Sequence, residues 1–154
     1  MKLFVTLLFL TNSLFCYSQT ENRITKLEIY GRIIIDGMSL GLPLVGKSEI
    51  KKKSTIYVEL KDEIRIEVSK VQDHIDGLEV SQDQFDFGEF NALLIVHYSK
   101  KKKEKYYIAG GEAGIYKDNI RYEYSCPFIS TVYSFLPVYY YEYESPYYYK
   151  KPCE

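Results

Sequence analysis

Apolar and polar residues alternate with a period of two through much of the chain. In residues 27–35 the odd positions are apolar or glycine, whereas the even positions carry Glu28, Tyr30 and Arg32. Such alternation is typical of a strand with one buried face, and the Asp36-Gly37 pair that follows is a turn signal. We therefore expect a half-buried strand over residues 27–35.

A second alternating stretch covers residues 54–69. Its even positions are apolar on both sides of a charged break, and its odd positions after residue 58 are mainly charged. A two-residue turn would place Leu60 opposite Glu63, on the same face. A three-residue turn at residues 61–63 pairs Leu60 with Ile64 and keeps one face apolar. The parity thus predicts a β-hairpin.

The second half of the chain is also rich in strand patterns. Residues 92–98 are apolar on both faces, which is typical of a central strand. A lysine-rich turn at residues 100–103 follows, and residues 105–109 are expected to form the next strand. Residues 120–124 alternate again, and residues 128–143 are mostly aromatic or β-branched. No stretch shows a convincing helical stripe. We predict an all-β fold of about seven to nine antiparallel strands, arranged as a sandwich of the immunoglobulin type or as a barrel.

The N-terminus has the features of a secretory signal peptide. Lys2 is the only charge in the first 18 residues, an apolar run follows at residues 3–10, and Cys16 and Ser18 are small residues at positions −3 and −1. A membrane anchor is the alternative, but the run is too short and interrupted to span about 30 Å of hydrocarbon. Lipid attachment at Cys16 is a further alternative, although the preceding Phe15 is bulky.

Cleavage after Ser18 divides the chain into three parts. We predict a signal peptide over residues 1–18, a β-sandwich domain over residues 19–136 and a Tyr-rich C-terminal strand or tail over residues 137–154. The mature chain has no later apolar segment long enough to span a bilayer. It is expected to be exported to the periplasm, the cell surface or the medium.

Composition narrows the class of protein. The chain has 154 residues, of which 46% are apolar and 27% charged, so it is long enough for one packed domain. Its net charge of −1 argues against a nucleic-acid binder, which normally carries a basic excess. In an oxidising compartment, Cys126 and Cys153 are more often bonded than reduced, and we interpret them as a disulfide.

The candidate catalytic and metal-binding groups each have a simpler interpretation. His97 lies in the apolar stretch and is expected to be structural, with a Cys126–His97 nucleophile and base as the alternative. The histidines and cysteines show no zinc spacing. The carboxylates of residues 73–89 are expected to form a solvated loop, with calcium binding as the alternative. Glycines 110, 111 and 114 are expected to form a plain turn, with a phosphate-binding loop as the alternative. We expect no enzyme activity, metal or cofactor.

Tyrosine is the unusual residue type, with 17 in the chain and most of them after residue 115. Its large apolar ring and polar tip suit sugar stacking and protein interfaces. A terminal strand followed by a sticky tail is the alternative interpretation. The candidate binding residues are Tyr139, Tyr141, Tyr143, Tyr147 and Tyr149.

Within residues 27–69, an early strand glycine and a turn acid are followed by a proline-leucine-x-glycine turn, formed by Gly31, Asp36, Pro43, Leu44 and Gly46. This short motif resembles the opening of carboxypeptidase regulatory-like domains. The sequence departs from that family at residues 47–53, which lack its usual aspartate and glycine turn. The resemblance implies a transthyretin-like β-sandwich, generally accessory rather than catalytic, and it transfers no active site.

These observations favour an exported, non-catalytic binding or structural module whose partner is a protein or a glycan. A small secreted hydrolase or an enzyme inhibitor is one alternative. An envelope-assembly or toxin-neutralising partner protein is another.

Overall fold

The computed structural model describes residues 23–32, 45–61, 65–85, 88–109 and 114–136. Six strands form one antiparallel sheet in the order β2-β1-β3-β4-β5-β6. The strands are β1 (Ile24–Gly31), β2 (Ile56–Lys61), β3 (Phe90–Tyr98), β4 (Lys103–Ala109), β5 (Ile115–Lys117) and β6 (Ile120–Tyr122). The helices are α2 (Ile50–Lys53), α3 (Arg65–Asp76) and α4 (Cys126–Ser134).

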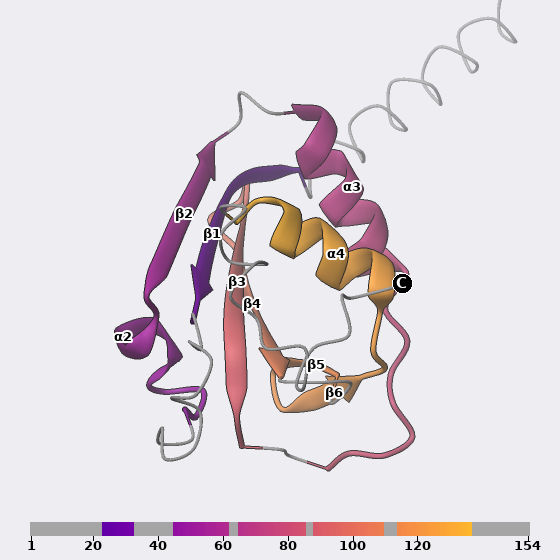
Figure 1. Ribbon diagram of the computed structural model, residues 1–154. Helices are drawn as coiled ribbons and strands as arrows, with labels where there is room; N and C mark the ends of the chain where they lie inside the picture. The colour runs from indigo at the N-terminus through magenta and orange to yellow at the C-terminus, as the bar shows by residue number, and fades with distance from the viewer. Residues whose placement is uncertain (1–22, 33–44, 62–64, 86–87, 110–113, 137–154) are drawn as a thin grey trace, which may run out of the picture.

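Helices α3 and α4 lie side by side over one face of the sheet (Figure 1). Val71 of α3 and Phe128 of α4 are fully buried there, in the same cluster as Leu94 of β3. On the opposite face a smaller cluster joins Ile50 of α2 to Ile95 of β3. The sheet is therefore buried on both faces near its centre.

The double burial explains the sequence of β3. Its even positions, such as Leu94 and Val96, face α3 and α4, whereas the odd positions Leu93 and Ile95 face the other cluster. The predicted central strand is confirmed. The lysine-rich turn is confirmed as well, since Lys101 has φ 61° between β3 and β4.

The predicted hairpin over residues 54–69 is wrong in its second arm. The first arm forms β2, but β2 pairs with β1, placing Leu60 opposite Leu27, and α3 begins at Arg65. Residues 64, 68, 71, 75 and 78 are all apolar, at intervals of three and four. That helical spacing extends over 15 residues and prevails over the three alternate positions that suggested a strand.

The region 128–143 was expected to be extended, and its first part is helical instead. In α4 the buried residues Phe128, Ile129, Val132 and Tyr133 recur at helical intervals, and Pro127 occupies the first turn. Proline is well tolerated there, because an N–H in the first turn has no partner within the helix. The expectation that no stretch has a helical stripe is therefore wrong for both α3 and α4.

The antiparallel, strand-rich character of the fold is confirmed. The sandwich of seven to nine strands is not, because the described residues contain six strands in a single sheet. No helix within the described residues is long and apolar enough to cross a membrane. The predicted signal peptide, the Asp36-Gly37 turn and the Tyr-rich segment 137–154 lie outside the described residues.

The chain between α3 and β3 runs along β6 and closes that end of the sheet. The backbone N–H of Ser81 donates to the carbonyl of Arg121, and the N–H of Glu123 donates to the carbonyl of Glu79. The side chain of Gln84 also accepts a hydrogen bond from the Arg121 N–H. These bonds bring the end of α3 close to β6.

Candidate functional site

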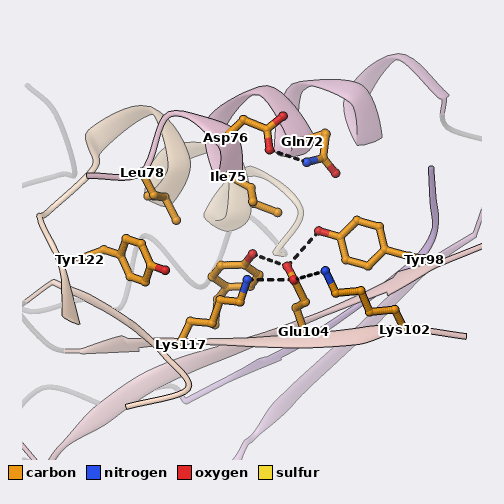
Figure 2. Close-up of a pocket in the computed structure, with 10 residues that line it drawn as sticks. Gln72, Ile75, Asp76, Leu78, Tyr98, Lys102, Glu104, Lys117 and Tyr122 are labelled. Carbon is orange, nitrogen blue, oxygen red and sulfur yellow. Dashed lines mark hydrogen bonds and ion pairs between the residues drawn. The ribbon is translucent and has the colours of Figure 1, made fainter. Parts of the chain in front are cut away.

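A cavity of about 230 Å³ lies between the C-terminal half of α3 and the sheet (Figure 2). Gln72, Ile75 and Asp76 of α3 line it from above, together with Leu78 just after the helix. The sheet and the lysine-rich turn contribute Tyr98, Lys102, Glu104, Tyr106, Lys117 and Tyr122. Most of this lining is polar or aromatic.

Glu104 lies at the centre of the sheet wall, and its side chain is only 9% exposed. Its Oε1 atom forms ion pairs with the Nζ atoms of Lys102 and Lys117, each at 2.8 Å. Its Oε2 atom accepts hydrogen bonds from the hydroxyl groups of Tyr106 at 2.6 Å and Tyr98 at 3.1 Å. Four donors therefore converge on one carboxylate, as Figure 2 shows.

These donors determine how Glu104 titrates. Burial alone would raise the pKa of the Glu104 carboxyl, but hydrogen bonds from Lys102, Lys117 and Tyr106 outweigh it and lower the pKa to about 2. Burial and the neighbouring Glu104 charge raise the pKa of the Tyr98 and Tyr106 hydroxyls well above their ordinary value. At neutral pH the carboxylate is charged and the phenols are protonated.

Strand alternation and the β3–β4 register place these groups together. Glu104 and Tyr106 are alternate residues of β4, and Glu104 is paired with Val96 of β3, which faces the helices. The ammonium groups of Lys102 and Lys117 lie 5.4 and 5.3 Å from the ring centres of Tyr98 and Tyr106 respectively. These cation–π contacts help to position the lysines.

The helix wall presents a different kind of group. The Nε2 atom of Gln72 donates to the Oδ1 atom of Asp76 at 2.7 Å, one helical turn later. The Oε1 atom of Gln72 is buried and has no hydrogen-bond partner within the described part of the chain. A buried acceptor without a donor costs free energy, and a rotation of the Gln72 side chain would bring this oxygen to a donor in the cavity.

A second buried carboxylate lies on the other face of the sheet. Oε1 of Glu28 is 2.7 Å from Nζ of Lys26 and 2.7 Å from Nε2 of His97, and Oε2 accepts a hydrogen bond from the Tyr30 hydroxyl at 2.9 Å. Burial opposes ionisation, but the Lys26 and Tyr30 hydrogen bonds lower the pKa of Glu28 to about 2. Burial lowers the pKa of His97.

The alternative pairing of Cys126 with His97 does not form. Cys126 begins α4, which packs on the face that carries Leu94 and Val96. His97 is the next residue of β3, and its ring contacts Glu28 on the opposite face. The sheet therefore separates the two residues.

The acidic residues of positions 73–89 that the structure describes do not form a cluster of metal ligands. Asp73 and Asp76 belong to α3, whereas Glu79 lies beside β6 through its backbone. Within the described ranges, no group of three or more histidine, cysteine, aspartate or glutamate residues could hold a metal ion. Asp86 lies outside those ranges, as do Gly110 and Gly111.

The tyrosines predicted to bind a partner all lie outside the described residues, and so does Cys153. Their roles, including the Cys126–Cys153 disulfide, stay predictions. Sequence reasoning missed the cavity around Glu104. The sequence did contain one indication of it, namely a charged residue on the buried face of a strand, since Glu104 shares its face with Tyr106 and Ile108.

Comparison with known proteins adds no family assignment. The chain matches no family model, no curated protein and no solved structure. The resemblance of residues 27–69 to carboxypeptidase regulatory-like domains therefore stays a prediction.

Proposed function

We propose that the protein is an exported, non-catalytic binding module that holds a small polar ligand between α3 and the sheet. The observation that carries this proposal is the cluster around Glu104, where two lysines and two tyrosines hold one carboxylate inside a cavity of about 230 Å³. A lining already held in place loses little conformational entropy on binding, which favours recognition of a small molecule.

The protonation states support binding rather than catalysis. A general base must accept a proton near the working pH. Glu104 and Glu28 both have pKa values lowered to about 2, so neither accepts a proton at neutral pH. Each carboxylate contributes a fixed negative charge to its surroundings.

Export and accessory character are part of the same proposal. Export depends on the signal peptide over residues 1–18, and the accessory role depends on the resemblance over residues 27–69. The transthyretin-like sandwich belongs to the same proposal, and the described residues form a single sheet. A secreted hydrolase, an enzyme inhibitor and an envelope-assembly or toxin-neutralising partner are the competing functions.

Binding to the cavity can be tested by NMR titration of the isotopically labelled mature chain. The probes are three sets of small molecules, namely neutral sugars, amino acids and carboxylic acids. We expect at least one set to shift the amide signals of Glu104, Lys117 and Gln72. Lys117→Met should weaken that binding at least tenfold, because it removes an ammonium group from the cavity and keeps the apolar stem.

Lys105→Met is the matched control. Lys105 is exposed and alternates with Glu104 and Tyr106 on β4, so it lies outside the cavity. The control should bind like the unmodified chain. Absence of cavity shifts with all three sets, or equal binding by Lys117→Met, would refute the proposal.

The Tyr-rich segment is a second proposed binding surface, favoured by its composition. Changing Tyr139, Tyr141 and Tyr143 together to alanine should reduce capture of a protein or glycan partner in a pull-down with the mature chain. The melting temperature should stay within a few degrees of the parent value. Undiminished capture would exclude this surface.

A further inference from the structure

The charged groups around the cavity balance one another. Two ammonium groups, from Lys102 and Lys117, face two carboxylates, from Glu104 and Asp76. Glu104 pairs with both lysines, and Asp76 accepts a hydrogen bond from Gln72. The sheet wall thus carries two ammonium groups against one carboxylate and the helix wall carries the Asp76 carboxylate, so a ligand with a net charge of either sign is attracted by one wall and repelled by the other. A ligand with no net charge avoids that repulsion.

The two walls of the cavity differ in hydrogen bonding, because the helix wall offers an acceptor and the sheet wall offers donors. On the helix wall, the buried Oε1 atom of Gln72 needs a donor. On the sheet wall, each lysine ammonium has three N–H groups, one of which can serve its single contact with Glu104. A hydroxyl group both donates and accepts. Several hydroxyls on one small frame could therefore satisfy both walls.

The shape and the apolar part of the lining fit a ring. The cavity of about 230 Å³ corresponds to the liquid volume of roughly eight water molecules, which is room for one pyranose ring. Tyr122 presents an aromatic ring to it and Ile75 contributes an aliphatic group, whereas the Tyr98 and Tyr106 rings are buried and have Lys102 and Lys117 over them. The Tyr122 ring can pack against the C–H face of a sugar.

We infer that this cavity binds a single neutral sugar ring, either free or at the end of a glycan. The inference deepens the proposed function and rests on it. The Gln72 side chain rotates on binding so that its Oε1 atom accepts from one sugar hydroxyl, and other hydroxyls accept from the ammonium groups of Lys102 and Lys117. The Glu104 carboxylate stays paired and serves to position the two lysines.

The test is a titration of the mature chain followed by calorimetry and by NMR. The neutral probes are glucose, galactose and mannose, and the charged probes are glucosamine and glucuronate. We expect at least one neutral hexose to bind, with shifts at the amides of Gln72 and Glu104. The glucosamine and glucuronate of matching ring configuration should bind at least tenfold more weakly. Methyl glycosides and disaccharides carry an added group at the anomeric carbon. Binding of these probes would indicate the end of a glycan as the ligand, and loss of binding would indicate a free sugar.

Gln72→Met is the decisive variant, because it keeps the length of the side chain and removes the acceptor. It should weaken hexose binding at least tenfold. Asp73→Asn changes an exposed side chain of the same helix that does not line the cavity, and it should bind like the parent. If Gln72→Met does not fold, Lys102→Met tests the sheet wall in the same way, because Lys102 is 57% exposed and belongs to a turn.

The outcomes separate this inference from the proposed function. Preferential binding of a charged sugar, or cavity shifts with amino acids or carboxylic acids alone, would overturn the neutral-sugar inference and leave the binding function standing. Cavity shifts with none of the probes would overturn both. Hexose binding unchanged by Gln72→Met and Lys102→Met would place the sugar elsewhere and overturn the inference.

Discussion

Two buried glutamates are held in the same way on opposite faces of the sheet. Glu104 accepts from two lysines and two tyrosines, and Glu28 contacts lysines, a tyrosine and a histidine. Removing a carboxylate from water is costly unless donors replace the lost hydration. Each glutamate is thus stable only because the fold surrounds it with donors.

Replacing Glu104 should reveal how much this cluster contributes. In Glu104→Gln the amide still accepts hydrogen bonds from the phenols, but two ammonium groups lose their counter-charge. We expect the free energy of unfolding to fall by about 2 to 4 kcal/mol, measured by urea denaturation at neutral pH. Glu123→Gln alters an exposed carboxylate and should stay within about 0.5 kcal/mol. Equal stability of both variants would contradict the proposed contribution of the cluster.

The same carboxylates predict an acid-sensitive fold. Their pKa values are about 2 in the folded chain, below the ordinary value of 4.5, so the unfolded chain binds more protons. The stabilisation is therefore present above about pH 4.5 and is lost as the pH falls towards 2. The lowered pKa of His97 acts in the same direction below pH 6.5.

Urea midpoints at pH 7, 4.5 and 3 check this prediction. The midpoint should fall most steeply between pH 4.5 and 3, and Glu104→Gln should fall less steeply, because one of the two carboxylates has been removed. Glu123→Gln should keep the parent slope. A midpoint that does not decline below pH 4.5 would be incompatible with the lowered pKa values.

Gly114 is a position where the backbone requires glycine. Its φ is 103°, and a Cβ atom would lie 2.6 Å from the carbonyl oxygen of Tyr122. Gly114→Ala should therefore destabilise the fold by about 1 to 3 kcal/mol in thermal or urea unfolding. Gly46→Ala is the control, because a Cβ atom there meets nothing within 4 Å and the backbone is ordinary. Similar stability of the two variants would show that the β5–β6 end accommodates a side chain.

At the level of elements, α3 shows why local alternation was misleading. The apolar residues 64, 66 and 68 alternate as in a strand. The longer apolar series of residues 64, 68, 71, 75 and 78 has the spacing of a helix. The tertiary structure buries Val71 completely against the sheet and packs Ile75 beside it. A strand would place the odd-numbered Val71 and Ile75 on the face opposite the even-numbered positions 64–68.

A proline in the middle of α3 tests the helix directly. Lys70→Pro removes a backbone hydrogen bond and introduces a steric clash, so it should cost about 3 kcal/mol or more of unfolding free energy. Lys70→Ala at the same exposed position should change stability by about 0.5 kcal/mol or less. Loss of helical circular dichroism in the proline variant alone would agree with α3. Equal spectra and equal stability would argue against it.

At the scale of the whole molecule, the described residues form a six-stranded sheet with two longer helices on one face. The functional proposal depends on this arrangement, because the cavity is formed where α3 crosses the β4–β5–β6 end. The part played by the first 18 residues is a separate prediction. Expression of the full chain in a secreting host should yield a mature product that begins at Gln19, detected by intact mass. A product that retains residues 1–18 would contradict the signal peptide.

What the sequence determined by itself is the strand content near the centre of the molecule. Alternation and double-sided apolar runs identified the first strand, β2, the central β3, the lysine turn and the return strand, because side-chain direction in a strand follows directly from residue parity. The tertiary structure decided which strands pair, that residues 65–76 and 126–134 are helical, and that Glu104, Lys117 and Gln72 share a cavity. Those outcomes depend on contacts between residues distant in the chain, and a local pattern contains no information about which distant surface will bury it.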